Sequence, residues 1–428
     1  MNLAKEIENY FDVLWTLNRS LTGADNRKSL EILSDISKID LLEIPSGEKC
    51  FDWVVPDEYI VREAYIETLD GNRIVDFQIH NLHLMGYSIA VDKVMSWDEL
   101  EYFIYFIEDM PDAIPYKTSY YVKSWGFCIS YNQYLQIDKS IKYHVVIDSE
   151  FNSKGSMTIG ERIIKGRRKE EILFSTYICH PSMANNELSG PLLTIFIQKL
   201  IEQQKDLEYT YRFLYLPETI GSICYLSKWG EYFKENLLAG FVVTCVGDAG
   251  KPTLKLSRRG DTIADRVVLN ILNSNSVEFN LRDYFPTGSD ERQYCSPYFN
   301  LPVVSLMRTM YSKYPEYHTS LDNKSIMSFS GMEELINYYY QIVIALENNK
   351  TYQSLNMKCE PFLQNKGLYN STGGPKSVPL NTSAALWLLN QADGTNDLIT
   401  ISNKSSIPIS TLHNVACALK DSKLISEI

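Results

Sequence analysis

Hydrophobic and polar positions follow two different periods along the first third of this 428-residue chain. Near the amino terminus, apolar side chains recur at helical spacing over residues 3–17 and again after Asp25, which we expect to cap a second helix. Between about residues 52 and 144 the apolar runs are short and strand-like, and Asp70-Gly71 has the composition of a hairpin turn. The pattern predicts two helices followed by a small β-rich domain.

From about residue 143 to residue 348, strand-like runs alternate with helical ones. The helical runs include residues 192–204 and 333–346. The strand-like runs are "YHVVIDSEF", "EEILFSTYIC", "YTYRFLYL", "LAGFVVTCVG" and "PVVSLM". Such alternation predicts an α/β fold whose mostly parallel, mixed sheet carries helices on both faces.

The carboxy-terminal tail has the pattern of a small helical module. After the loop-like stretch "NKGLYNSTGG", three helical patterns cover residues 384–389, a segment around 398–399, and residues 410–424 with Ser410 as a cap. Three short helices in this order predict a helix-turn-helix or winged-helix module. The tail has no arginine and more acidic residues than lysines, so we favour a protein partner over nucleic acid.

These patterns divide the chain into four parts. Residues 1–50 are amino-terminal helices that belong to the α/β domain, and residues 51–143 are an inserted β-rich domain. Residues 144–352 form the α/β domain itself, and residues 353–428 form a linker and a winged-helix-like domain.

Composition and charge exclude several classes of function. The chain is 45% hydrophobic and 22% charged, which is ordinary for a globular protein. Its net charge of -12 argues against sequence-independent nucleic-acid binding, which needs a cationic surface. No apolar run approaches the roughly 20 residues of a membrane span, and Glu6 and Glu8 stand where a signal peptide is basic, so we expect a cytoplasmic protein. The oligomeric state stays open, and a homo-oligomer is compatible with the sequence.

The eight cysteines are scattered and form no C-x-x-C pair. Neither a disulfide framework nor a thiolate zinc site is therefore indicated.

Metal-ligating side chains follow several of the predicted strands of the α/β domain. His180 follows "EEILFSTYIC", Glu218 follows "YTYRFLYL", Asp248 follows "LAGFVVTCVG" and His318 follows "PVVSLM". Ligands of open α/β sheets bind beyond the carboxyl ends of the strands, and imidazole with carboxylate suits Zn²⁺ with a position open for water. Taken alone, His180 is equally compatible with a structural role.

A second histidine pair, His80 and His83 in "IHNLHL", lies in the β-rich domain. A spacing of three residues in a strand points the two rings to opposite faces, so a structural role is favoured over a shared metal.

Four arginines flank the same strand ends, namely Arg258, Arg259, Arg292 and Arg308. Guanidinium forks bind carboxylate or phosphate at two points, so these arginines are candidates to hold an acidic group of a substrate. Pairing with the chain's own 53 acidic residues is an equally good explanation. In the inserted domain, the aromatic side chains at 120, 121 and 125 are candidates either to overhang the cleft or to pack in the core.

The order of the strand-end motifs resembles the zinc aminopeptidases that use a co-catalytic pair of metal ions. Those enzymes have a first His, an A-x-D-N-x-S-G-like loop whose Asp bridges the metals, a Glu pair, an Asp after a strand, and a distant His before Thr or Ser. The matching pieces here are His180, "ANNELSG", "PETIGS", "VGD" and "HTSLD", with "GSDERQY" matching a further segment.

Over nearly its full length, the chain more closely resembles a bacterial family with an aminopeptidase-like domain. That family has an inserted β domain and a carboxy-terminal winged helix, and is associated with polysaccharide biosynthesis. The strings that carry the resemblance are "FDWVVPDEY", "YYVKSWGFC", "CHPSMANNELSG" and "KLSRRGDT".

The resemblance implies a metallohydrolase that holds one or two zinc ions. Metal-bound water would cleave an amide bond in a peptide or an amino-acylated small molecule, with Glu218 as the catalytic carboxylate. Carried over position by position, His180 and Asp248 hold one metal, Glu218 and His318 hold the other, and Asn186 lies at the bridging position.

Two positions depart from the family pattern. Asn186 stands where a bridging carboxylate is expected, and an amide offers one neutral oxygen in place of two charged ones. Glu187 is a candidate substitute, although neighbouring side chains generally point elsewhere. The Glu pair is reduced to Glu218, which must be either general base or metal ligand.

Two hypotheses follow from these departures. The first is a zinc-dependent, aminopeptidase-like hydrolase. The second is a catalytically inactive, peptidase-like binding or assembly protein of surface polysaccharide biosynthesis. A serine or cysteine hydrolase is a distant third, because no G-x-S-x-G elbow occurs in the chain.

Overall fold

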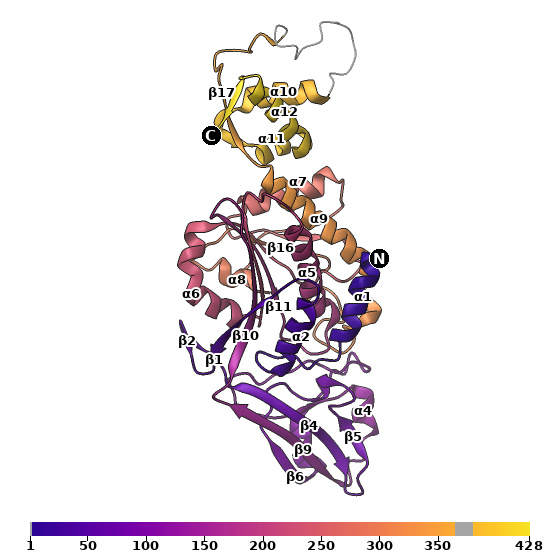
Figure 1. The fold of residues 1–428 in the computed structure, drawn as a ribbon. Coiled ribbons are helices and arrows are strands. Elements are labelled where there is room, and N and C mark those ends of the chain that lie inside the picture. The colour runs from indigo at the N-terminus through magenta and orange to yellow at the C-terminus, as the bar shows by residue number, and fades with distance from the viewer. Residues whose placement is uncertain (1, 364–379) are drawn as a thin grey trace. The chain divides into compact units, whose positions relative to one another are not determined.

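The computed structural model describes residues 2–363 and 380–428 (Figure 1). The loop-like stretch "NKGLYNSTGG" lies outside the described residues. The chain folds as two compact units, one of Met1–Gly260 with Asn280–Ile336 and one of Asp261–Phe279 with Asn337–Ile428.

The first unit is built on an eight-stranded mixed sheet. Its strands lie in the order β1 (Asp40–Pro45), β10 (Ser156–Ile164), β12 (Thr210–Leu216), β11 (Glu171–Tyr177), β13 (Leu237–Val242), β16 (Val303–Met307), β14 (Thr253–Lys255) and β15 (Asn280–Arg282). The run from β12 through β11 and β13 to β16 is parallel, and antiparallel pairs join β1, β10 and β14 to it. The predicted α/β fold with a mostly parallel, mixed sheet is confirmed.

Helices cover both faces of this sheet, as the chain's path requires. From β11 the chain crosses through α5 (Ser189–Glu202) to β12, and then returns through α6 (Ile220–Asn236) to β13 on the other side of β11. Parallel crossovers are right-handed, so crossovers in opposite directions place their helices on opposite faces. Figure 1 shows α5 on the face that also carries α1 (Leu3–Leu14) and α2 (Ala24–Ser34), and α6 on the other.

Every residue of β11 and β12 is buried, which explains why these strands read as continuous apolar runs. The reversal of direction at β11 creates the crevice in which α/β folds hold their ligands. His180 follows β11 and is therefore placed at this crevice.

The second helix begins differently from the prediction. Gly23, not Asp25, is the N-cap of α2, with φ of 123° and with the Tyr59 carbonyl oxygen 3.2 Å from the place of a Cβ. Only glycine adopts such a conformation readily. The Asp25 carboxylate instead accepts a hydrogen bond from the Asn18 backbone N–H at 2.7 Å.

The inserted domain contains a four-stranded antiparallel sheet. Its strands lie in the order β5 (Arg73–Asp76), β4 (Glu58–Thr68), β9 (Lys142–Asn152) and β6 (Val91–Ser96). Between β4 and β5 the chain turns at Asp70-Gly71, where Gly71 has φ of 86°, so the predicted hairpin turn is confirmed. Shorter elements are β2 (Lys49–Cys50), β3 (Trp53–Val54), α3 (Trp97–Leu100), β7 (Ile104–Tyr105), β8 (Phe127–Cys128) and α4 (Tyr131–Gln136).

Strand β9 contains "YHVVIDSEF", which the sequence pattern predicts to be the first strand of the α/β domain. It instead pairs with β4 and β6 along its length. Its alternate residues Tyr143, Val145 and Ile147 are buried in the core of the inserted domain. The strands of the eight-stranded sheet resume only with β10 at Ser156.

The histidine pair of the inserted domain lies in a short turn and not in a strand. The residues around His80 and His83 form the 3₁₀ helix η1 (Asn81–His83), in which His80 Nδ1 accepts a hydrogen bond from the Leu82 backbone N–H at 3.1 Å. His83 Nδ1 lies 2.7 Å from the Cys128 carbonyl oxygen. Desolvation lowers the pKa of His80 to about 4. Both rings therefore serve local structure.

The second unit contains the winged helix. Its elements are α7 (Ile263–Ser274), β17 (Thr351–Ser354), α10 (Leu380–Gln391), β18 (Asp393–Asp397), α11 (Leu398–Ser405), α12 (Ile409–Asp421) and β19 (Ile425–Glu427), together with the part of α9 (Phe329–Glu347) from Asn337 on. The three strands pair in the order β18-β17-β19 and form the wing. The predicted winged helix is confirmed, although Pro408 and not Ser410 is the N-cap of α12.

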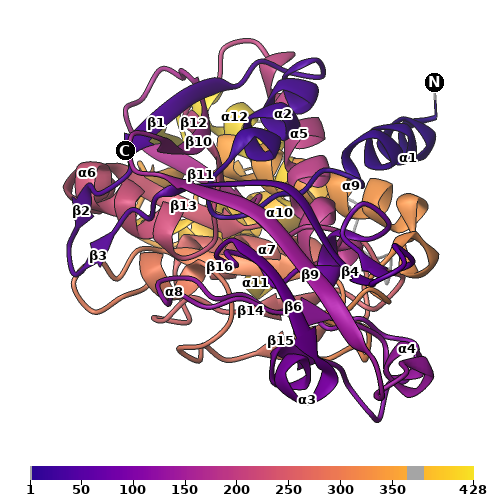
Figure 2. The ribbon, with the colours of Figure 1, turned by 90° about the horizontal axis from the view of Figure 1, so that it is seen from below.

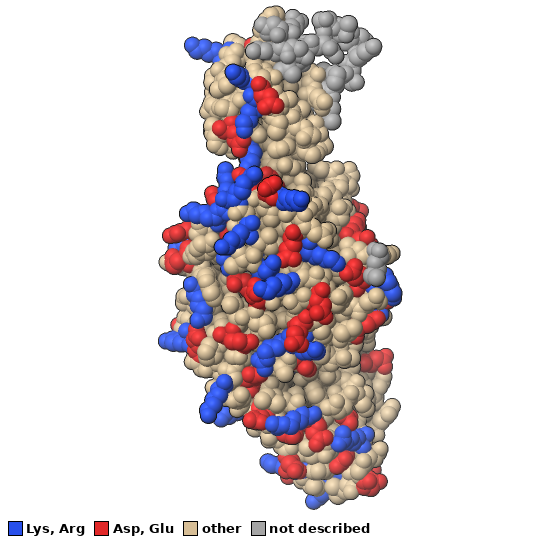
Figure 3. Space-filling model, in the orientation of Figure 1, with Lys and Arg blue, Asp and Glu red and all other residues tan. Residues whose placement is uncertain are grey.

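Figure 2 shows the same ribbon turned by 90° about the horizontal axis. Acidic and basic side chains are interspersed on the face of the molecule drawn in Figure 3. Among the described helices, none is long and apolar enough to cross a membrane.

Candidate metal and active site

A pocket of about 300 Å³ lies where β11 and β12 end. It combines polar groups that follow these strands with aromatic side chains of the β2–β3 hairpin and the inserted domain. Its lining residues are Leu21, Trp53, Tyr120, Tyr121, Cys179, His180, Glu218, Thr219, Ile220 and Arg292. The strand-end crevice predicted from the sequence is therefore a real concavity.

His180 is held from behind by Glu187. Its Nδ1 lies 2.8 Å from Glu187 Oε2, while its Nε2 lies 3.7 Å from Glu218 Oε2. Glu187 sits on the π-helical turn η3 (Ala184–Leu188), which leads directly into α5. Nδ1 is thus placed to donate to a carboxylate, an arrangement that orients metal-binding histidines in proteins and directs Nε2 outward.

The Glu187 charge is compensated by a second buried group, Arg19. The Nε of Arg19 lies 3.7 Å from Glu187 Oε1, and both side chains are 0% exposed. Arg19 also donates to the Leu14 carbonyl oxygen at 2.7 Å. Glu187 therefore belongs to a buried network of Arg19, Glu187 and His180, and does not take the place of the missing bridging carboxylate.

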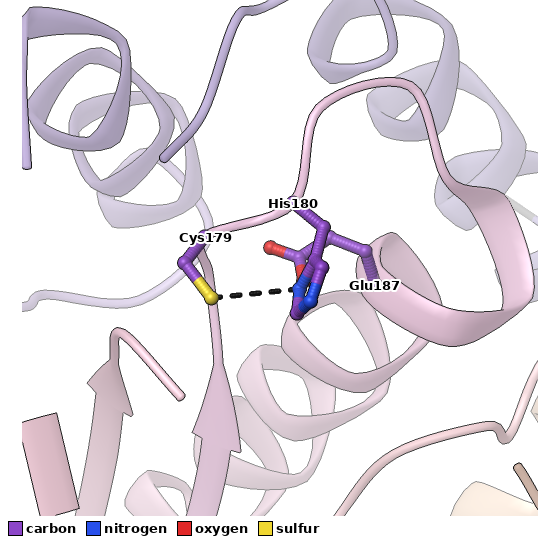
Figure 4. A group of neighbouring side chains, drawn as sticks. All are labelled: Cys179, His180 and Glu187. Carbon is purple, nitrogen blue, oxygen red and sulfur yellow. Dashed lines mark hydrogen bonds and ion pairs between the residues drawn. The ribbon is translucent and has the colours of Figure 1, made fainter. Parts of the chain in front are cut away.

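The Cys179 sulfur lies 3.4 Å from the same ring nitrogen, His180 Nδ1 (Figure 4). Ligand atoms of Cys179, His180 and Glu187 all lie within 4.8 Å of one another, so their distances alone would permit a metal ion. Desolvation raises the pKa of the Cys179 thiol to about 11, and its sulfur accepts the Glu218 backbone N–H at 3.2 Å. A protonated thiol and a carboxylate already facing Arg19 make this trio a poor cation site.

His318 approaches from a distant loop and faces His180, with ring centroids 5.6 Å apart. Its ring stacks on Tyr317 at 3.9 Å and meets the edge of Tyr116 at 5.3 Å. Desolvation lowers the pKa of His318 to about 3, which keeps the imidazole neutral, and neutral imidazole is the form that binds metals. Neither ring nitrogen of His318 has a hydrogen-bond partner among the residues that the structure describes.

Glu218 projects into the pocket from the end of β12, with a side chain that is 23% exposed. Desolvation raises the pKa of Glu218 to about 7. The next residue, Thr219, has φ of 68°, and its backbone N–H donates to Asp290 Oδ1 at 2.7 Å. A backbone held in this sparsely populated region is the kind of strain found at active sites.

Asp248 and Asn186 are engaged by the protein itself. Asp248 Oδ2 accepts from the Asn185 side-chain amide at 2.9 Å, and Oδ1 accepts from the Gly250 backbone N–H at 2.6 Å. Asn186 Oδ1 accepts from the Tyr177 hydroxyl at 3.2 Å. Of the five predicted ligands, the structure brings His180, Glu218 and His318 together, and supplies Asp248 and Asn186 with hydrogen-bond partners from the chain.

The comparison with known families follows from this fold and site. A family described as a domain of unknown function, DUF4910, matches residues 8–349, and a winged helix-turn-helix family matches residues 350–427. The chain belongs to the DUF4910 family.

A close relative of this DUF4910 protein occurs in Clostridium acetobutylicum. It is described as a polysaccharide biosynthesis protein with an aminopeptidase-like domain, and is 42% identical over 414 residues, which are 97% of this chain and 94% of the relative. A crystal structure described as that of a peptidase from the same organism has a TM-score of 0.91 at 40% identity, covering 99% of this chain and 96% of that one. The family resemblance inferred from the motifs is confirmed.

More distant solved structures share the fold. A zinc aminopeptidase from Bacillus subtilis has a TM-score of 0.56 at 11% identity, covering 79% of this chain and 94% of that one. A peptidase M28 precursor from Shewanella amazonensis has a TM-score of 0.56 at 13% identity, covering 80% and 92%.

The four arginines of this DUF4910 protein have different surroundings. Arg292 lines the pocket. Arg308 is buried and donates to Glu334 and to the Gly331 carbonyl oxygen, each at 2.6 Å, while Arg258 and Arg259 are exposed and do not line the pocket. The aromatic candidates divide similarly, because the tyrosines at 120 and 121 line the pocket whereas the tryptophan at 125 stacks on Phe103 in the core.

Sequence reasoning missed Asp322, the last residue of "HTSLD". This buried carboxylate accepts backbone hydrogen bonds from Asn185 at 2.7 Å and Asn186 at 3.0 Å, and a hydroxyl bond from Tyr314 at 3.0 Å. It thereby ties the loop of His318 to the loop after His180. Only its closeness to His318 in the chain could have suggested this role.

Proposed function

We propose that this protein is a metal-dependent amide hydrolase of the zinc aminopeptidase type. It would act at the amino end of a peptide or on an amino-acylated small molecule. The observation that carries the proposal is the position of His180 between two potential ligands from other segments: its Nε2 lies 3.7 Å from Glu218 Oε2, and its ring centroid lies 5.6 Å from that of His318. The family's aminopeptidase-like fold supports the same reaction class.

The donor set suits one divalent ion. Two imidazoles and a carboxylate are three ligands of the kind that catalytic zinc sites use, and they leave a position open. The unpartnered ring nitrogens of His318 and the outward Nε2 of His180 are available to such an ion. When bound, it would act as a Lewis acid and make water a stronger acid. A second ion fits less well, because Asn186 carries no charge and Asp248 is already hydrogen-bonded.

The chain's own side chains would divide the remaining work. Glu187 holds the His180 ring in place, and Tyr317 and Tyr116 hold that of His318. Glu218 is the carboxylate in the pocket wall that can accept a proton. The aromatic walls restrict the access of bulk water to the amide.

Metal analysis of protein purified without chelator tests this proposal directly. We expect close to one zinc per chain, and little zinc in His180→Ala and His318→Ala. His413→Ala, in the winged helix, is the matched control and should keep its zinc. Absence of any bound transition metal after zinc addition would rule out the proposal.

The variant Glu218→Gln distinguishes a role of Glu218 as general base from a role as metal ligand. If Glu218 is the general base, zinc content stays at the wild-type level and kcat falls by roughly 10²–10⁴. If it is a ligand, zinc content falls as well. Hydrolysis of amino-acid anilides, followed together with zinc content, distinguishes the two roles.

A second candidate function is a binding or assembly protein without catalysis, acting in surface polysaccharide biosynthesis and meeting a protein partner through its winged helix. Asn186 favours it, because this amide stands at the bridging position and its oxygen already accepts from Tyr177. Asn186→Asp discriminates between the candidates. Gained amidase activity with tighter zinc binding would indicate that the natural protein has lost catalysis at this residue, whereas no change in either would mean that residue 186 is not a bridge.

A further inference from the structure

We propose that the pocket binds a substrate with an anionic group, a carboxylate or a phosphate, and that Arg292 is the residue that recognises it. This inference rests on the proposed function, because it concerns the same pocket. It adds the chemical class of the substrate.

Arg292 is a cation without an ion-pair contact among the described residues, and the carboxylates of Glu218 and Asp290 act on it only through space. It lies on the short helix α8 (Glu291–Tyr294) and lines the pocket beside Glu218 and Thr219. One terminal nitrogen donates to the Thr219 hydroxyl at 2.6 Å, and its buried Nε has no hydrogen-bond partner. Within the described residues, no carboxylate lies within 4.0 Å of its guanidinium nitrogens.

Arg292 is half-buried, whereas the buried arginines of the described residues each face a carboxylate. Arg212 is paired with Glu171 at 2.7 Å, Arg308 with Glu334 at 2.6 Å, and Arg19 faces Glu187 at 3.7 Å. Withdrawing a guanidinium from water without a partner is costly, so an unpaired one at a pocket wall is suited to an anion from outside. Arg292 differs from the paired arginines in this respect.

The carboxylates nearest to Arg292 in sequence are directed elsewhere. Asp290 Oδ1 accepts from the Thr219 backbone N–H and from the Ser222 hydroxyl, both at 2.7 Å, at the start of α6. Glu291 Oε1 pairs with the fully buried Lys255 at 2.6 Å. Neither acid is among the lining residues of the pocket.

Thr219 fixes the position of the guanidinium. Its hydroxyl accepts from Arg292, and its own backbone is held at φ of 68° by the hydrogen bond to Asp290. Holding the fork in place before binding reduces the entropy that is lost when an anion is bound. Glu218, the carboxylate among the lining residues, has its Oε2 3.7 Å from His180 Nε2 and makes no ion-pair contact with Arg292.

The size and walls of the pocket limit the rest of the substrate. A volume of about 300 Å³ accommodates a single amino-acid or sugar residue. Trp53 and Tyr121 meet edge to face at 5.7 Å and are partly exposed, so they offer ring surface to an apolar or ring-shaped portion. The substrate class is therefore a small anionic amide, with its anion at Arg292 and its amide beside His180 and Glu218.

Calorimetric binding of matched pairs of probes tests this inference. The pairs are N-acetylglycine with N-acetylglycinamide, D-glucuronate with D-glucuronamide, and glucose 6-phosphate with glucose, so the three arms distinguish an amino-acid carboxylate, a sugar carboxylate and a phosphate. In at least one arm, wild-type protein should bind the anionic member about tenfold or more tightly than its uncharged partner. Arg292→Gln should reduce this preference to within about twofold, and Arg292→Lys should keep part of it.

Arg282→Gln is the matched control, because Arg282 is an exposed arginine of β15 outside the pocket, and it should keep the full preference. Thermal unfolding of each variant shows whether it is folded. The inference is overturned if wild-type protein shows no preference in any arm, or if a folded Arg292→Gln variant keeps it. Zinc content and hydrolysis of leucine anilide, which carries no anionic group, are measured in wild-type protein and report on the proposed hydrolase separately, so either idea can fail while the other stands.

Discussion

At the scale of single residues, the site depends on how buried charges are balanced. His180, Glu187 and Arg19 form a network with little access to water, in which Glu187 has a partner on each side. From the sequence, Glu187 is a candidate to replace the bridging carboxylate that is missing at Asn186. Its contacts instead assign it to orienting His180 and neutralising Arg19.

We expect Glu187→Gln to destabilise the protein by about 3–5 kcal/mol, because it leaves the Arg19 guanidinium buried without a counter-ion. Zinc affinity should also fall by about 10–100-fold, since His180 loses its charged partner. Urea unfolding and zinc titration measure the two effects. In the double variant Arg19→Met with Glu187→Gln, much of the lost stability should return, and a strictly additive double variant would contradict the proposed pairing.

His144 gives a prediction for the dependence of stability on pH. On β9 its Nε2 lies 2.8 Å from Asp92 and its Nδ1 lies 3.0 Å from Glu67, and these hydrogen bonds raise its pKa above the ordinary 6.5. A raised folded-state pKa means that the stabilisation is complete below pH 6.5 and is lost as the pH rises through the folded value. The difference in urea midpoint between wild type and His144→Ala should therefore be larger at low pH than at high pH. An equal difference in urea midpoint at low and high pH would show that the contacts of His144 with Asp92 and Glu67 do not stabilise the protein.

At the scale of elements, two loops make one site. Backbone N–H groups of the turn η3 donate hydrogen bonds to the Asp322 carboxylate. Asp322 follows His318 by four residues. The geometry between His180 and His318 thus depends on a loop-to-loop tie and not on either strand alone. Asn185 extends the same tie to Asp248 through its side-chain amide.

We expect Asp322→Asn to cost about 1–3 kcal/mol of stability, because the amide leaves buried backbone donors of η3 without full acceptors. Hydrogen exchange of the amides of residues 184–188 should become faster than in wild type. Asp283→Asn, at an exposed position, is the control and should leave exchange unchanged. Unaltered exchange in Asp322→Asn would mean that the turn holds its shape without this carboxylate.

At the scale of the molecule, the inserted domain takes part in the site. The Tyr116 backbone N–H donates to the His318 carbonyl oxygen at 2.9 Å, and Pro115 and Thr319 form an isolated β-bridge. The domain therefore supports the histidine loop in addition to providing the aromatic wall of the pocket. An insertion that is separate in the sequence therefore contacts the loop of His318 and lines the candidate site.

The winged helix likewise recruits a helix from the middle of the chain. In the second unit, Arg266 of α7 pairs with both carboxylate oxygens of Asp397 at 2.8 and 3.0 Å, and Asn270 donates to the Ser402 hydroxyl at 2.8 Å. The compact unit is therefore larger than the family match at residues 350–427.

We expect Arg266→Ala to weaken this unit by roughly 1–3 kcal/mol through loss of a two-point, charge-assisted contact. Limited proteolysis should then cleave the region around α11 more readily than in wild type. Arg282→Ala, at an exposed position, serves as the control. Cleavage at the wild-type rate would show that the α7 contact does not stabilise the winged helix.

Several features of the fold could be predicted from the sequence because they depend on local patterns. Continuous apolar runs indicated the buried strands β11 and β12, and helical spacing located α5 and α9. The prediction for strand β9 is wrong about the sheet to which it belongs, because an alternating apolar run does not indicate which strands it pairs with. Those strands, β4 and β6, lie far away in the sequence. The closeness of the histidines at 180 and 318 is predictable because each follows a strand of the same sheet. The roles of Asp322 and Arg19 in holding the site are not predictable from the sequence.

The sequence by itself determined the types of element, the order of the strand-end motifs and the family to which the chain belongs. Tertiary structure alone decided which polar groups are free for chemistry and which are already used by the protein. The physical reason is that a side chain's role depends on its partners and its access to water, and both are set by residues far away in the chain. Arg308 and Arg292 have the same side chain near the same strand ends, yet one is paired with Glu334 and the other faces the pocket.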